Sequence, residues 1–159
     1  IHVAVPSRAQ YEPGFYRWLE RLACMAGNLE CRIVFHARED TMEMITEFIR
    51  NCHSGVRAEY QVMSHWNEVP RLAASIADDH MFVVVTARKG TVSYKSAQEQ
   101  LPYEIMQHFN GKNLMIIFPD QYGGTMDEMT FAQPQHTEER SAYELIHEWF
   151  NKKLHHIQQ

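Results

Sequence analysis

One unbroken apolar run constrains the fold of this 159-residue chain more than any other feature. Residues 81–87 read Met-Phe-Val-Val-Val-Thr-Ala, and the run stops at the cationic, hydroxyl-rich stretch Arg-Lys-Gly-Thr-Val-Ser over 88–93. A strand that is apolar without alternation is typical of a parallel sheet buried on both faces. The run therefore predicts an α/β fold, and the polar stretch marks the carboxyl edge where such sheets bind ligands.

Further strands and helices alternate along the chain. The other predicted strands cover 2–5, 31–37, 57–63 and 113–119, and the predicted helices cover 13–26, 40–54, 68–77, 102–109 and 137–154. Asp40 and Asn67 are predicted to cap the second and third helices, Asp40 in a capping box with Glu43. The alternation predicts a five-stranded parallel sheet with helices on both faces, plus a C-terminal helix.

Composition limits the class of protein. The chain is 45% hydrophobic and 22% charged, which fits one globular domain over 1–159. Its net charge of -5 argues against a nucleic-acid partner, which would need a basic face. No segment approaches the ~18–20 consecutive apolar residues that span a bilayer. Because the sequence enters a strand almost at its first residue, we expect a domain excised from a longer polypeptide.

The candidate binding residues follow the first and fourth strands. Arg88, Lys89, Gly90, Thr91 and Ser93 come after the fourth strand, and their charges and hydroxyls suit a phosphate or carboxylate. A second wall is expected from the two residues that follow the first strand, if the two strands are neighbours; these are Ser7 and Arg8. The alternative interpretation is a solvated loop that only connects two elements.

Motifs for catalysis or metal binding are missing from the sequence. It has no GxSxG elbow, no P-loop and no GxGxxG after the first strand. The ten histidines show neither HExxH nor Cys/His zinc spacing, so no metal site is predicted. We therefore expect a protein that is not an enzyme; a small α/β enzyme with a site assembled from unconnected residues is a weaker hypothesis.

The fold pattern resembles that of the universal stress proteins, within the adenine nucleotide alpha hydrolase-like group. Residues 79–94 (DHMFVVVTARKGTVSY), 101–103 (LPY) and 113–119 (NLMIIFP) are similar to a narrower group. That group is the cytosolic C-terminal domain of bacterial sodium or potassium/proton antiporters. The similarity covers about the central third of the chain, and the remainder agrees only in the order of strands and helices.

The resemblance implies a non-catalytic regulatory domain attached to a membrane transporter of the same polypeptide, on the cytoplasmic side of the cell membrane.

Nucleotide-binding stress proteins carry a glycine-rich signature after the fourth strand. Here Gly90 stands alone, Ser93 occupies the next glycine position, and no later Gly-Ser or Gly-Thr follows at the right distance. Without these glycines the backbone approaches a triphosphate less closely. The cofactor is therefore left unknown, with a nucleotide as one possibility.

Two further hypotheses concern partners. A fifth strand at the edge of the sheet would offer an apolar ladder to a second copy, so a homodimer is expected. The competing hypothesis for the whole chain is a stand-alone universal stress protein that binds a nucleotide.

Overall fold

The computed structural model describes residues 1–120, which belong to a compact unit spanning Ile1–Tyr122. Its centre is a five-stranded sheet in the order β3-β2-β1-β4-β5, and every neighbouring pair is parallel. The predicted α/β class and five-stranded parallel sheet are confirmed. The helix predicted over 137–154 lies outside the described residues.

The three central strands are the most buried. β1 covers His2–Ala4, β2 covers Ile33–Ala37 and β4 covers Met81–Val85. Val3 of β1 lies opposite Phe35 on one side and Val83 on the other, and all three side chains are fully buried. Chain regions far apart in sequence therefore meet at β1. The condition on which the second wall of the predicted site depended, that the first and fourth strands are neighbours, is met.

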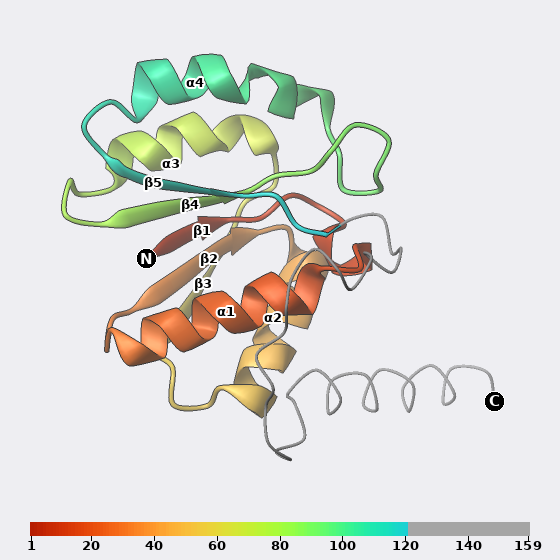
Figure 1. The fold of residues 1–159 in the computed structure, drawn as a ribbon, viewed down its shortest axis with the longest axis vertical. Coiled ribbons are helices and arrows are strands. Elements are labelled where there is room, and N and C mark those ends of the chain that lie inside the picture. Colours follow the sequence, from red (N-terminus) through yellow and green to blue (C-terminus); the bar gives the residue numbers. More distant parts are fainter. Residues whose placement is uncertain (121–159) are drawn as a thin grey trace, which may run out of the picture. The chain divides into compact units, whose positions relative to one another are not determined.

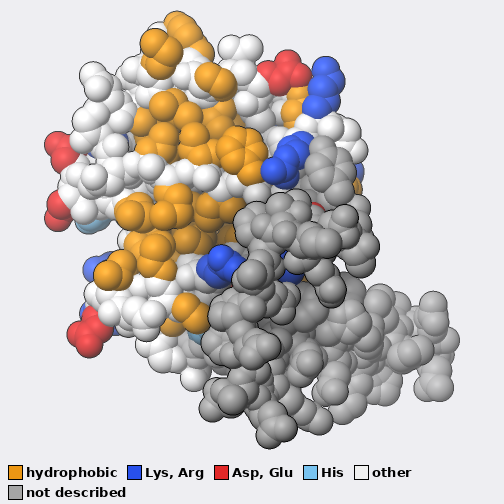
Figure 2. All heavy atoms as spheres, in the orientation of Figure 1, with side chains coloured by type: hydrophobic (Ala, Val, Ile, Leu, Met, Phe, Trp, Pro, Cys, Tyr) orange, Lys and Arg blue, Asp and Glu red, His pale blue; other side chains and the backbone are white. Residues whose placement is uncertain are grey.

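The two edge strands are more exposed. β3 covers Ala58–Val62 and β5 covers Asn113–Ile117. They form the two ends of the strand order. β5 has the same kind of apolar sequence as β4, yet Ile116 is 37% exposed and no residue of the strand is fully buried. Figure 2 shows hydrophobic side chains on the surface along this edge of the sheet.

The helices cover opposite faces of the sheet. α1 (Phe15–Asn28) and α2 (Glu39–Cys52) follow β1 and β2, whereas α3 (Val69–Ser75) and α4 (Leu101–His108) follow β3 and β4. Right-handed crossovers place helices on opposite faces when the strand order reverses direction, and the order reverses at β1. Figure 1 shows α1 and α2 on one side of the sheet and α3 and α4 on the other.

The α3–α4 side of the sheet has a continuous apolar core. Trp66, Val69 and Ala73 pack with Phe82 and Val84, and further members come from β1 and α4. The other side is closed by α1, whose inward-facing residues recur at helical spacing. These are Phe15, Trp18, Leu19, Leu22, Ala23 and Ala26.

Three short 3₁₀ helices lie at the carboxyl edge of the sheet. They are η1 (Ala9–Tyr11), η2 (Trp66–Glu68) and η3 (Ser96–Gln100). η2 runs into α3 and η3 runs into α4, so each prepares the start of a helix on the same face.

Both predicted N-caps are wrong. α2 begins one residue before Asp40, which lies in its first turn, and Arg38 occupies the cap position. The first turn of a helix still favours an acidic residue such as Asp40, because the positive end of the helix dipole lies there. Asn67 lies inside η2; the turn is closed instead by the His65 amide, which donates to Glu68 Oε1 at 2.8 Å.

No helix within residues 1–120 is long and apolar enough to cross a membrane.

Candidate functional site

The loops after β1 and β4 meet at the carboxyl edge of the sheet, where the strand order reverses. Open parallel sheets commonly bind ligands at such a point. The predicted residues of both loops do lie at this edge. Most of them, however, contact other parts of the chain itself.

A buried carboxylate joins the two loops. Glu12, which follows η1, is 6% exposed, and Ser93 in the β4 loop is 1% exposed. Glu12 Oε1 accepts from the Ser93 amide at 2.8 Å and from Ser93 Oγ at 2.6 Å. Hydrogen bonds to a carboxylate are short and about twice as strong as neutral ones. The Ser93 hydroxyl, which was expected to hold a ligand anion, is therefore engaged by Glu12, and so is the Ser93 amide.

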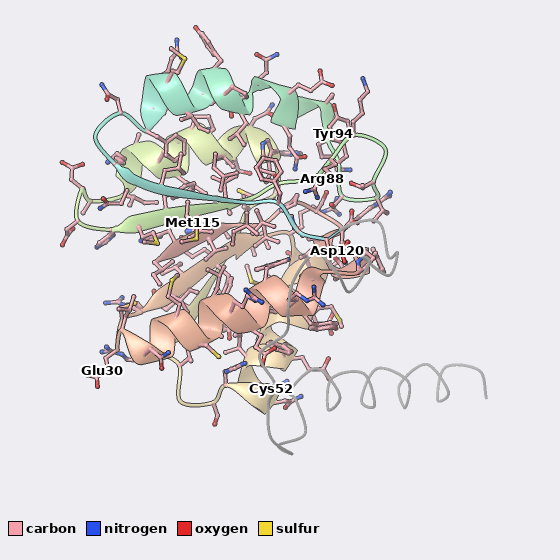
Figure 3. The ribbon with its side chains drawn as sticks, viewed as in Figure 1. Glu30, Cys52, Arg88, Tyr94, Met115 and Asp120 are labelled. Atoms are coloured by element: carbon pink, nitrogen blue, oxygen red, sulfur yellow. The ribbon has the colours of Figure 1, made fainter. Side chains whose placement is uncertain are left out.

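Arg88 connects the β4 loop to the end of β5. Its Nη1 donates to the Pro119 carbonyl at 2.6 Å, and its guanidinium lies 5.6 Å from the centre of the Phe118 ring. Thr91 Oγ1 donates to the Arg88 carbonyl at 2.7 Å, which closes the turn that follows. In Figure 3, Arg88 lies with Tyr94 and Asp120 at this end of the sheet. Arg88 thus has a structural role in fixing the exit of β5.

The chain after β5 also contacts the start of α1. The Gly14 amide donates to the Asp120 carbonyl at 2.8 Å. A Cβ built on Gly14 would lie 2.7 Å from the Asp120 nitrogen and 2.8 Å from its oxygen, so only glycine permits this approach. Residues 118–120 therefore bridge the β4 loop and the N-terminus of α1.

The remaining predicted residues lie near the surface. Arg8 is exposed and has a left-handed backbone, with φ 66°. Lys89 Nζ lies 3.9 Å from a Glu99 carboxylate oxygen, and both side chains are largely exposed. Gly90 has φ +92°, which a glycine adopts without strain. The Tyr94 hydroxyl also donates to Glu99, and this bond raises the pKa of the phenol.

A pocket of about 360 Å³ opens beside this junction, over the carboxyl ends of β1, β2 and β3. Ser7 is the one predicted site residue that lines it. Its walls come from the turns after the three strands and from the segment that leads into η3. The lining residues are Val5, Ser7, Arg38, Met63, Ser64, His65, Trp66, Asn67, Lys95, Ser96 and Ala97.

The polar groups of the pocket suit an anion. Its charged or titratable residues are Arg38, Lys95 and His65, and no acidic residue lines it. Arg38 Nε lies 3.7 Å from Asp40 Oδ1, but both side chains are about half exposed, so this ion pair is weak. Three serine hydroxyls and an asparagine amide add neutral hydrogen-bonding groups. This lining can neutralise and orient a small anionic molecule.

Trp66, which lines the pocket, and Gln98, which follows the lining residue Ala97, have buried polar atoms without hydrogen-bond partners among the described residues. Trp66 is 8% exposed, and its Nε1 has no partner among the described residues. Gln98, in η3, is 7% exposed, and neither its amide oxygen nor its amide nitrogen has a partner there. Buried polar groups in native proteins are normally satisfied, so bound water is the expected partner of these atoms, as it is of Trp18 Nε1 and Glu104 Oε2, which do not line the pocket.

The sequence contained a signal for part of this pocket. Arg38 directly follows the second predicted strand, and Ser64 and His65 directly follow the third. The argument that parallel strands bind ligands at their carboxyl ends applies to them as it does to Ser7. Lys95 lies in a stretch without periodicity, and the Glu12–Ser93 contact joins positions that no local pattern relates.

No group of three or more His, Cys, Asp or Glu side chains in residues 1–120 is arranged to hold a metal ion. Comparison with known proteins leaves the site unassigned. No family model matches the chain, and neither a curated protein nor a solved structure matches it.

Proposed function

We propose that this chain is a non-catalytic regulatory domain of a sodium or potassium/proton antiporter, and that it binds a small anionic ligand in the pocket between η2 and η3. The domain would lie on the cytoplasmic side of the cell membrane, as part of an integral membrane protein. The basic lining of the pocket is the observation that supports binding of an anionic ligand. The antiporter assignment rests on the similarity of residues 79–94, 101–103 and 113–119.

The pocket supports binding more directly than the loop after β4 does. Arg38 and Lys95 line it from two different segments, the turn after β2 and the stretch that leads into η3. A ligand with negative charge would bond to both cations. By contrast, Ser93 and Arg88 in the β4 loop already bond to Glu12 and to the end of β5.

Regulation would follow from linkage between the pocket and the transporter. A ligand shifts an equilibrium between two arrangements only by its difference in affinity for them. The pocket is built from the ends of three strands and the start of η3, so occupancy would stabilise one arrangement of these turns. Regulation of this kind depends on the binding free energy of the ligand and requires no chemical reaction.

We also propose that the domain forms a homodimer through β5. This strand is an edge of the sheet, and the partly exposed Ile116 lies on it. Phe118, just beyond the strand, is 60% exposed. An open, apolar edge strand favours pairing with a second strand.

The ligand proposal is tested by calorimetry on the purified chain, with ATP and inorganic phosphate as separate probes. Arg38→Ala and Lys95→Ala should each weaken binding of an anion that does bind by about ten-fold, the lower range for a lost charge-assisted contact. Lys89→Ala is the matched control, because Lys89 is a neighbouring cation outside the pocket. Equal loss in all three variants, or no loss in the pocket variants, would contradict the proposed site.

The antiporter assignment is tested by immunoblotting membrane and soluble fractions of the source cells with an antibody to this domain. A band well above 18.7 kDa in the membrane fraction supports a transporter that carries the domain. A soluble band at the mass of the chain would replace the assignment with a stand-alone stress protein that binds a nucleotide.

A further inference from the structure

Three histidines form a row across the sheet, away from the pocket. His36 lies on β2, His2 on β1, and His80 directly precedes β4. The ring centres of His2 and His36 are 5.4 Å apart, and those of His2 and His80 are 5.2 Å apart. The planes differ by 19° and 22°, so the three rings are nearly parallel.

Strand register explains the row. His36 lies opposite Ala4, and His2 lies opposite Phe82, so each histidine is a diagonal neighbour of the next. Alternate residues of a strand share one face, which places the row on the same face as Ala4 and Phe82. That face is the one covered by α3 and α4.

The central contact requires at least one neutral ring. His2 Nδ1 lies 3.2 Å from His36 Nε2, so one nitrogen must donate and the other must accept. If both rings were cationic, both nitrogens would carry protons, and a hydrogen bond would be replaced by repulsion. His36 is 2% exposed, so a charge on it would also be buried.

The groups around His2 lower its pKa more than they raise it. Burial lowers it most, followed by His36, the Ile1 amino group and His80, whereas Glu59 raises it. Glu59 is itself bonded to Arg32 at 2.9 Å. Asp79 lies 3.9 Å from His80, and Lys112 pairs with Asp78 just before β5 and β4. Apolar residues also pack on this side of the sheet: Val69 and Ala73 of α3, and Ile76 just after it.

We propose that the row His36–His2–His80 is an acid-responsive latch, which holds β1 between β2 and β4 while the His2–His36 hydrogen bond is intact and loosens when both of these rings are protonated. The latch affects the pairing of β1 with its two neighbouring strands. This proposal therefore does not depend on a ligand in the pocket.

The direction of the response follows from proton linkage. Burial, and then the neighbouring His36, lower the pKa of His2 from 6.5 to about 4 in the folded protein. Burial also lowers the pKa of His36. Because the opened state binds protons at the higher, normal pKa, the latch is fully stabilising above pH 6.5. Its contribution is lost as pH falls from there toward the folded pKa of about 4.

Hydrogen exchange with the intact protein tests the latch. For His2 alone, linkage between a pKa of 6.5 and one of about 4 gives roughly ten-fold more opening at pH 5.5 than at pH 7.5, and about three-fold after allowance for its partial exposure. Because burial lowers the pKa of His36 as well, we expect the protection factors of the Val3 and Val34 amides to fall by more than about three-fold. Unchanged protection would overturn the proposal.

One variant and one control test whether the histidine row causes the pH response. His36→Gln keeps a polar group near the Nε2 position but cannot be protonated, so the fall in protection should be smaller than in the wild type. His108→Gln, at the exposed end of α4, should behave as the wild type. If His36→Gln does not fold, wild-type NMR titration decides: His2 and His36 must remain neutral at pH 6, and ordinary titration near pH 6.5 refutes the latch.

Discussion

The buried Glu12–Ser93 contact gives the sharpest stability prediction. Glu12→Ala removes two hydrogen bonds that a carboxylate accepts from the buried Ser93 amide and hydroxyl. Each bond to a charged group contributes about 1.5–3 kcal/mol, and the gain from no longer burying the carboxylate offsets part of the loss. We expect Glu12→Ala to lower the free energy of unfolding by about 3 kcal/mol.

Two related variants divide this effect between its parts. Glu12→Gln keeps an oxygen acceptor but loses its charge, so it should cost about half as much as Glu12→Ala. Ser93→Ala removes the 2.6 Å bond and keeps the 2.8 Å bond from the backbone amide, so it should cost about 1.5 kcal/mol. Because the alanine variants remove one bond in common, their double mutant should be less destabilised than the sum, by about 1.5 kcal/mol.

The assay is urea unfolding at pH 7, followed by circular dichroism, for the wild type, the three single variants and the Ala/Ala double mutant. Slopes with urea must agree among the variants for their midpoints to be compared. Strict additivity of the two alanine substitutions, or a loss below about 0.5 kcal/mol for Glu12→Ala, would refute the reasoning.

Two further outcomes are expected. Gly14→Ala should lower the free energy of unfolding by about 1–3 kcal/mol, because its Cβ would overlap the Asp120 backbone; Gly55→Ala, with no atom within 4 Å of its Cβ, should change it by less than about 0.5 kcal/mol in the same urea assay. Ile116→Lys should convert a β5-paired dimer to a monomer in sedimentation velocity, because charge at an edge strand opposes pairing; a monomeric wild type would remove the dimer proposal.

Much of the fold could be predicted from the sequence because strands and helices leave local patterns. The apolar run at 81–87 and the helical spacing of Trp18, Leu19 and Leu22 identified β4 and α1 close to their observed bounds. The exposure of β5 could not be predicted in this way, because an apolar run records a preference for burial and says nothing about which strand ends at an edge. Caps were misplaced because several polar residues near a helix start can serve, and backbone geometry selects one.

The sequence predicted the location of the site better than it predicted the residues that form it. The carboxyl edge was expected from the topology, and Ser7 does line the pocket. Arg88 and Ser93 were expected at a ligand, but they bond to Pro119 and Glu12. Charge and hydroxyl content show that a residue can bind an anion, whereas the choice between a ligand and the chain's own groups depends on long-range contacts. Such contacts have no local signature in one sequence.

The central position of β1 also determines the order in which the protein can be assembled. β1 pairs with β2, which follows soon after it, but its other edge must wait for β4. During synthesis from the N-terminus, β1, β2 and β3 can associate while the second edge of β1 is still open, and closing long loops slows such non-local pairing. The pocket is completed later still, because its Lys95 wall follows β4. A nascent chain would therefore expose an apolar strand edge until most of the domain has left the ribosome, which makes this interval the one in which it depends most on chaperones.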